Sequence, residues 1–147
     1  MGTTELRIAD NRIRLVQAGD HFQVRDVEFH VYPSYDANEP QAVTLVLTTG
    51  GKSLFVSGDT ADGPALSEIA AAHALDYALL AFGRTWYMSE PELIRVASKL
   101  NPKTLLPFHW EFWRNHTGDI GRLFETYYRE RPDFEIKILL VGDSIQL

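Results

Sequence analysis

The sequence predicts an α/β protein in which a β-meander is followed by alternating strands and helices. Up to Ser57, apolar residues recur in short alternating or continuous runs that are typical of strands. Beyond Ser57, segments with a helical repeat of apolar residues take turns with short apolar segments. The chain has 147 residues, of which 45% are hydrophobic, and no linker separates the two regions. We therefore expect residues 1–147 to form a single domain with its own core.

The first region is predicted to contain four strands. Apolar and polar residues alternate at residues 12–16 ("RIRLV") and 26–32 ("DVEFHVY"), and a β-rich run follows at residues 42–47 ("AVTLVL"). The turn-forming sequence "TTGGK" then leads into residues 53–57 ("SLFVS"). Strands joined by short turns in this way form a meander.

The second region is predicted to alternate between helices and buried strands. Ser89 and Glu92 have the spacing of a capping box, which predicts a helix start, and the sequence Asn101-Pro102 predicts its end. Pro64 suits the first turn of an earlier helix. The expected helices span residues 64–75, 89–100 and 118–131, and the expected strands span residues 76–82, 104–108 and 135–141.

The composition excludes several classes of function. A net charge of −6 argues against general binding to nucleic acid or to anionic membranes. The chain has no cysteine, so a metal site would have to use histidine, aspartate or glutamate. The amino-terminal residues lack a signal-peptide pattern, and no apolar run reaches membrane-spanning length. We therefore expect a cytoplasmic protein.

Two expected strand ends carry candidate metal ligands. Asp59 follows one strand in "FVSGDT", where Gly58 permits a tight turn, and His109 follows another in "LLPFHW". Side chains at strand ends are exposed yet held by a rigid sheet, and a carboxylate with an imidazole suits Zn, Mn or Fe. Each residue also has an ordinary interpretation, because an aspartate after glycine is commonly a turn former, as at Asp143, and a lone histidine is commonly structural.

Four blocks of the sequence, "VEFHVYPSYD", "AVTLVLTTGGKSLFVSGDT", "LDYALLAFG" and "ELIRVASKLNPKTLLPFHWEFW", run through nearly the whole chain. In order, spacing and type they resemble the C-terminal half of metallo-β-lactamase-fold hydrolases, specifically their L-ascorbate-6-phosphate lactonase branch. The resemblance implies half of an αββα sandwich and a divalent metal, Zn or Mn, as cofactor. In that family the aspartate of the GD[ST] block and the histidine of the P-[FV]-H block bind the metals, which implies metal-binding and catalytic roles for Asp59 and His109.

The sequence departs from that family at its principal metal motif. The motif H-x-H-x-D-H, which belongs to the family's N-terminal half, is absent, and histidines occur singly at positions 21, 30, 73, 109 and 116. Tyr35 stands where many related enzymes have a histidine, and Phe82 replaces a family tyrosine. A catalytic zinc generally needs three protein ligands and an open position. We therefore expect this polypeptide to be inactive by itself unless the remaining ligands are supplied from elsewhere.

Three explanations of the missing motif are open: a subunit of a split enzyme, a part of a longer gene, or a non-catalytic interaction or scaffold module that keeps the fold. An isolated half of the sandwich would leave an apolar sheet face uncovered. We therefore expect a homodimer or a partner chain with the N-terminal half. The substrate that the resemblance implies is a phosphosugar lactone or another small-molecule ester.

Several further residues have candidate roles. Arg84 and Arg114 follow expected strands and are candidates for binding a phosphate. Aromatic residues after the strand 104–108 could line a substrate pocket or belong to the core: Trp110, Phe112 and Trp113. His30 shares a strand face with Glu28 and is interpreted as a solvated or interfacial side chain.

Overall fold

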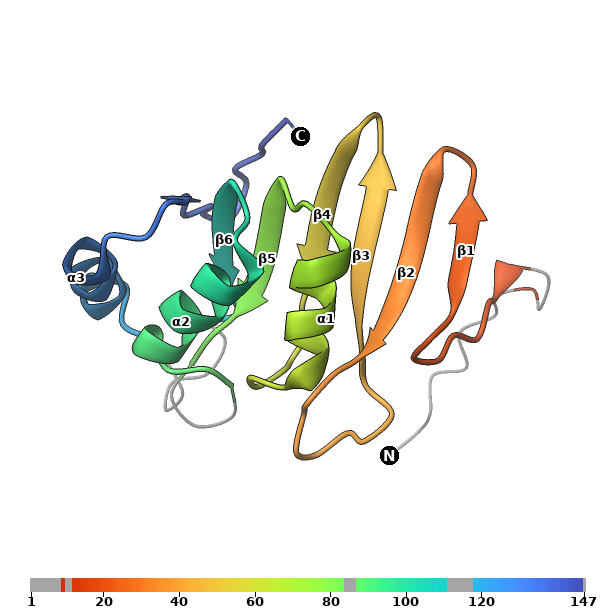
Figure 1. Cartoon of the computed structure of the whole chain (residues 1–147), viewed down its shortest axis with the longest axis horizontal. Helices are drawn as coiled ribbons and strands as arrows, with labels where there is room; N and C mark the ends of the chain where they lie inside the picture. The colour runs from red at the N-terminus through yellow and green to blue at the C-terminus, as the bar shows by residue number, and fades with distance from the viewer. Residues whose placement is uncertain (1–8, 10–11, 84–86, 111–117, 147) are drawn as a thin grey trace.

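Seven strands form one mixed sheet in this computed structural model, which describes residue 9 and residues 12–83, 87–110 and 118–146 (Figure 1). The strands lie side by side in the order of the sequence: β1 (His21–Val24), β2 (Val27–Pro33), β3 (Val43–Thr49), β4 (Lys52–Val56), β5 (Tyr77–Ala81), β6 (Thr104–Phe108) and β7 (Glu135–Ile136). The helices in this part of the chain are α1 (Pro64–Ala72), α2 (Glu90–Leu100) and α3 (Ile120–Glu130). None of these helices is long and apolar enough to cross a lipid bilayer.

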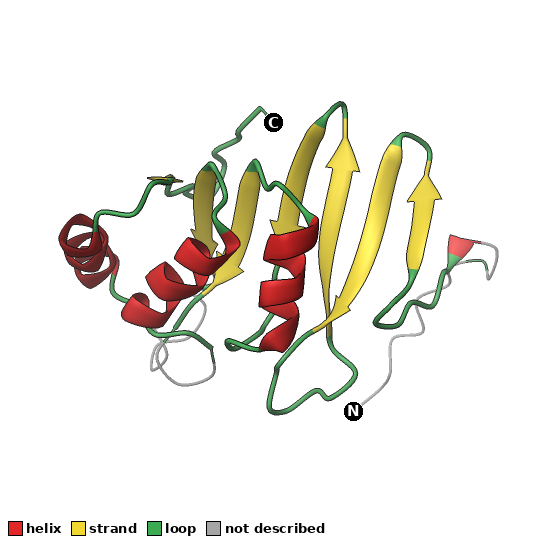
Figure 2. Ribbon diagram, in the orientation of Figure 1, coloured by secondary structure: helices red, strands yellow, loops and turns green. Residues whose placement is uncertain are grey.

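The sheet changes from antiparallel to parallel at β4. The pairs from β1 to β4 are antiparallel, whereas those from β4 to β7 are parallel. Each parallel connection passes through one helix, as Figure 2 shows. The predicted meander followed by alternating strands and helices is therefore confirmed. Because parallel strands end at the same edge of a sheet, the carboxyl ends of β4, β5 and β6 meet there.

The face of the sheet that the helices cover holds the hydrophobic core. Val46, Phe55, Ala78 and Leu105 are successive register partners across β3 to β6, and all four are fully buried. In Figure 1, α1 and α2 lie in front of the sheet and α3 lies beside α2. The helices contribute to the same cluster the side chains of Leu66, Ile69, Leu93, Val96, Ala97, Leu100 and Leu123.

The opposite face of the sheet is apolar and only half-buried. Phe29, Leu47, Leu54 and Tyr77 are register partners on this face, because side chains alternate between the two faces along each strand. All four have intermediate exposure, and the described helices lie on the other face. A sheet with helices on one face and apolar side chains on the other matches one half of an αββα sandwich.

The structure corrects the predicted first strand. Residues 12–16 lie outside any strand, and the first strand is His21–Val24. Alternation of apolar side chains alone does not provide residues 12–16 with a neighbouring strand to pair with, and Leu15 remains 90% exposed. The turn at residues 25–26 instead folds β1 back on β2, so that Val24 pairs with Val27.

The predicted last strand is also shorter than expected. Of residues 135–141, only Glu135–Ile136 pair with β6. The chain then leaves the sheet, and the side chain of Val141 is fully exposed. The capping box of the second helix is confirmed, because the backbone N–H of Ser89 donates to Oε2 of Glu92 at 2.9 Å.

Candidate metal-binding site

Asp59 lies in the loop that follows β4, just beyond the sheet edge. Gly58 makes the turn with a φ of +56°, in the left-handed region that favours glycine. The Ser34 hydroxyl, from the loop after β2, donates a 2.8 Å hydrogen bond to the Asp59 carbonyl oxygen. The backbone of Asp59 is therefore fixed from two loops, while its side chain remains 37% exposed.

His109 directly follows β6 at the same edge of the sheet. Its φ is +68°, a conformation that non-glycine residues rarely adopt and that occurs preferentially at functional sites. The backbone before it is held to the neighbouring strand, because the N–H of Phe82 donates to the carbonyl of Phe108 at 3.1 Å. The imidazole of His109 is 18% exposed, so it is held in place yet accessible.

The structure brings the two predicted ligands together. Nε2 of His109 lies 3.7 Å from Oδ1 of Asp59. Two ligand atoms bound about 2.1 Å from a tetrahedral metal lie about 3.4 Å apart, so this separation fits a shared metal ion. Among the described residues, no third histidine or carboxylate joins them to form a three-ligand group. The pair therefore fits a divalent metal as part of a ligand set.

Tyr87 is a member of the site that the sequence did not reveal. Its hydroxyl donates a 3.0 Å hydrogen bond to Oδ2 of Asp59, and its ring packs edge-on against His109 with centroids 4.7 Å apart. Burial, and after it the hydrogen bond to Asp59, raises the pKa of the Tyr87 hydroxyl to about 12. The hydroxyl is thus a permanent donor at neutral pH. Tyr87 follows β5, so the position after a parallel strand was the available signal.

Tyr35, at the position of a histidine in many related enzymes, has a structural role. Its hydroxyl accepts a 2.9 Å hydrogen bond from the backbone N–H of Ala65 in the first turn of α1. Its ring lies so close to Gly63 that a Cβ there would overlap it. Phe82, which replaces a family tyrosine, is fully buried in the core. Neither residue is placed as a metal ligand.

A hollow of about 470 Å³ adjoins His109. Its walls are mostly apolar and include Leu79, Leu106, Trp110 and Leu140. Small-molecule sites in proteins typically have volumes of about 300–1,000 Å³, so this hollow has a suitable size. Of the other candidate pocket and phosphate-binding residues, Arg84, Phe112, Trp113 and Arg114 lie outside the described residues, and so does the single histidine His116.

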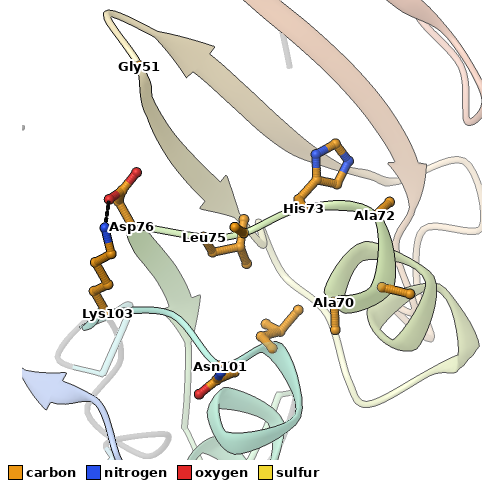
Figure 3. Close-up of a pocket in the computed structure, with 11 residues that line it drawn as sticks. Gly51, Ala70, Ala72, His73, Leu75, Asp76, Asn101 and Lys103 are labelled. Atoms are coloured by element: carbon orange, nitrogen blue, oxygen red, sulfur yellow. Dashed lines mark hydrogen bonds and ion pairs between the residues drawn. The ribbon is translucent and has the colours of Figure 1, made fainter.

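A second hollow, of about 690 Å³, lies at the opposite end of the parallel strands (Figure 3). It is lined by Asp76 and Lys103, which precede β5 and β6 and pair with each other at 2.8 Å. Asp59 and His109 follow the carboxyl ends of β4 and β6, so this hollow is remote from both. It is not part of the candidate metal site.

Solved structures of a metallo hydrolase and of a metallo-β-lactamase-fold protein share this architecture. Igni18, a metallo hydrolase from Ignicoccus hospitalis, matches with a TM-score of 0.76 and 14% identity over 88% of this chain and 58% of its own. The metallo-β-lactamase-fold protein YhfI from Bacillus subtilis matches with a TM-score of 0.69 and 11% identity over 87% of this chain and 53% of its own. This chain has the metallo-β-lactamase fold. It spans about half of the fold in those structures, as the sequence blocks implied.

The chain also has distant relatives in sequence. The UlaG protein of Salmonella paratyphi B, assigned as an L-ascorbate-6-phosphate lactonase, is 26% identical over 136 aligned residues. The alignment covers 76% of this metallo-β-lactamase-fold chain but only 38% of UlaG. No family model matches the chain. The chain is thus a distant homologue of the lactonase over most of its own length.

Proposed function

We propose that this chain contributes Asp59 and His109 to the metal site of a metal-dependent hydrolase. The observation that carries the proposal is the convergence of the two side chains, 3.7 Å apart, from the ends of β4 and β6. Their edge of the sheet is the place where α/β proteins generally build their sites. The similarity to a metallo hydrolase and to a lactonase supports the same conclusion.

Tyr87 has a positioning role in this proposal. Its hydrogen bond occupies Oδ2 of Asp59, which leaves Oδ1, the oxygen near His109, to face the metal. Hydrogen bonds of this kind orient metal ligands and adjust their basicity. When bound, a divalent metal supplies the Lewis acidity that polarises an ester carbonyl and lowers the pKa of water. Asp59 and His109 hold the ion, and Tyr87 fixes the carboxylate that receives it.

The substrate class that we propose is a small-molecule ester or lactone, with a phosphosugar lactone as the first compound to test. The hollow beside His109 has the size of a small-molecule site. Leu79 and Leu106 in its wall lie on the apolar sheet face, so a second β-layer on that face would form the opposite wall. The lactonase assignment of the Salmonella relative supports the choice of a sugar lactone.

The remaining ligands, in our proposal, come from a second β-layer with the family's histidine motif that packs on the apolar sheet face. Two ligands do not make a catalytic zinc site. The half-buried side chains of Phe29, Leu47, Leu54 and Tyr77 form a suitable contact surface. In Igni18 and YhfI the matched part is 58% and 53% of the chain, which leaves room for such a layer.

The test is the metal content of the purified chain after incubation with Mn²⁺ or Zn²⁺ and removal of excess ions. The parent is the His30→Ala chain, in which a separate group of potential metal ligands around His30 is disabled. This parent is compared with Asp59→Ala and His109→Ala made in the same background. Asp143→Ala is the matched control, because Asp143 also follows a glycine but lies in a turn near Leu140. Metal that both substitutions remove and the control retains supports the proposal and justifies a lactonase screen.

Absence of metal in every variant would mean that Asp59 and His109 cannot hold an ion without further ligands. The assay is then repeated with the second β-layer added as a separate protein that carries the H-x-H-x-D-H motif. If neither metal binding nor lactone hydrolysis appears in that mixture, the hydrolase proposal is overturned. The chain would then be a module that keeps the fold without the chemistry.

A further inference from the structure

A second group of metal-ligand side chains lies on the hairpin of β1 and β2, apart from the site described above. His21, Glu28 and His30 each present a ligand atom, and these three atoms lie within 4.8 Å of one another. Among the described residues, this is the group of three or more potential ligands that the structure brings together. Neither Asp59 nor His109 belongs to it.

The hairpin register explains why these residues meet. His21 of β1 and His30 of β2 are direct register partners, so their side chains leave the sheet opposite each other. Glu28 lies two residues before His30 on the same strand and therefore on the same face. The turn at residues 25–26 fixes this register. The cluster is thus a consequence of backbone pairing.

The two imidazoles converge on one carboxylate oxygen. Nε2 of His21 lies 2.6 Å from Oε1 of Glu28, and Nε2 of His30 lies 3.5 Å from the same atom. The two imidazole rings stack with centroids 4.1 Å apart. The three ligand atoms therefore face a common point, and small side-chain rotations would place a cation between them.

The cluster is open to a cation from solvent. The side chains of His21, Glu28 and His30 are 55%, 44% and 28% exposed, so an ion can enter from solvent. Water can fill the coordination positions that the protein leaves open.

The far side of His30 is supported by the chain after α1. The ring of His73 packs edge-on against His30, with centroids 4.9 Å apart. Nε2 of His73 is in turn 2.8 Å from the Tyr32 hydroxyl. The His30 ring is therefore packed between His21 of β1 and His73 at the end of α1, which restricts the orientation of the ring.

We propose that His21, Glu28 and His30 bind one divalent transition-metal ion of the Zn²⁺ class. Two imidazoles and one carboxylate form a recurrent zinc ligand set that leaves a fourth position for water. Imidazole nitrogens favour Zn²⁺, Cu²⁺ and Ni²⁺ over Ca²⁺ and Mg²⁺, which prefer oxygen ligands. The bound ion cross-links β1 to β2 and stabilises this short edge hairpin of the sheet. The site is independent of the function proposed for Asp59 and His109.

The test is a calorimetric titration of the tag-free chain with Zn²⁺ alone, and with Mg²⁺ for comparison. We expect about one Zn²⁺ per chain at this site, and at least about tenfold weaker binding in each of His21→Ala, Glu28→Gln and His30→Ala. Gln23→Ala is the matched control, because Gln23 lies on the same face of β1 and outside the cluster. The Zn²⁺ affinity of the Gln23→Ala variant should equal that of wild type.

Thermal unfolding supplies a second readout. Zn²⁺ should raise the melting temperature of wild type and of Gln23→Ala, because an ion that binds only the folded state stabilises it. The rise should vanish when the three cluster substitutions are made in an Asp59→Ala background, which disables the strand-end site. All three replace partly exposed side chains, so the variants should remain folded by circular dichroism. Retained Zn²⁺ binding by both His21→Ala and His30→Ala in that background, or no Zn²⁺ binding by wild type, overturns the proposal. If only Asp59→Ala and His109→Ala remove the ion, this proposal fails and the strand-end site stands.

Discussion

The hydroxyl of Tyr87 donates a hydrogen bond of 3.0 Å to Oδ2 of Asp59. The two oxygens of this carboxylate therefore have different neighbours, because Oδ2 accepts from Tyr87 and Oδ1 lies near His109. A carboxylate held at one oxygen loses less freedom when its other oxygen binds a metal. The loop after β5 therefore belongs to the site as much as the loops after β4 and β6.

Replacement of Tyr87 by phenylalanine should weaken metal binding while the fold is retained. The loss of a hydrogen bond to a metal-binding carboxylate typically lowers metal affinity about 10–100-fold. We expect Tyr87→Phe, in the His30→Ala background, to hold less Zn²⁺ or Mn²⁺ than its parent under identical washing. Tyr128→Phe, on the exposed surface of α3, is the control and should match the parent. Equal metal content in Tyr87→Phe and its parent would show that Tyr87 does not position Asp59.

Gly63 should not tolerate a side chain. Its ideal Cβ would overlap the ring of Tyr35, so Gly63→Ala must displace a residue that anchors the first turn of α1. Such overpacking typically costs about 1–3 kcal/mol in the free energy of unfolding, which urea denaturation measures. In a Tyr35→Ala background the ring is gone, and the same substitution should cost much less. Equal costs in the two backgrounds would contradict this explanation.

The acid stability of the protein should depend on Asp76. Its carboxylate accepts hydrogen bonds from Lys103 at 2.8 Å and from the backbone N–H of Ser53 at 3.0 Å. The Lys103 contact, followed by that of Ser53, lowers the pKa of Asp76 from its ordinary value of 3.8. A pKa that is lower in the folded state stabilises the fold at pH values above the unfolded pKa. This contribution is lost as the pH falls through the folded pKa.

The measurement is the free energy of unfolding in urea between about pH 7 and pH 3. Asp76→Asn should be less stable than wild type near neutral pH, and the difference should shrink below about pH 4 because wild type then loses its advantage. The exposed Asp133 provides the control, and Asp133→Asn should follow the wild-type profile. A constant difference between Asp76→Asn and wild type at every pH would contradict the linkage.

Local signals in the sequence predicted local structure well. The Ser89 and Glu92 capping box needs only residues three apart, and the structure contains it. The position of the first strand could not be predicted in this way. Residues 12–16 show the alternation of apolar and polar side chains that is typical of a strand, but residues 21–24 are the ones that pair with β2. Pairing depends on a turn and a partner strand, which periodicity does not report.

In the candidate site too, local sequence signals identified some residues and missed those that only the fold brings together. Asp59 and His109 were predicted because each directly follows an apolar strand, and the structure places them 3.7 Å apart. Tyr87 was missed because it lies several residues beyond the end of β5, in a loop whose path the sequence does not fix. His21 and His30 were seen as isolated histidines, because their proximity requires the register of the hairpin.

The apolar sheet face should drive association of the isolated chain. Leu47, Leu54 and Tyr77 pair in register on that face and are only half-buried, so contact between chains removes apolar surface from water. We expect the chain to sediment as a dimer or larger species, and Leu54→Glu to shift it toward monomer because a buried unpaired charge is costly. Tyr128→Glu, on the exposed side of α3, should leave the sedimentation of the chain unchanged. A stable, well-dispersed wild-type monomer would mean that the half-buried face needs no partner, and the proposed second β-layer would lose its main physical support.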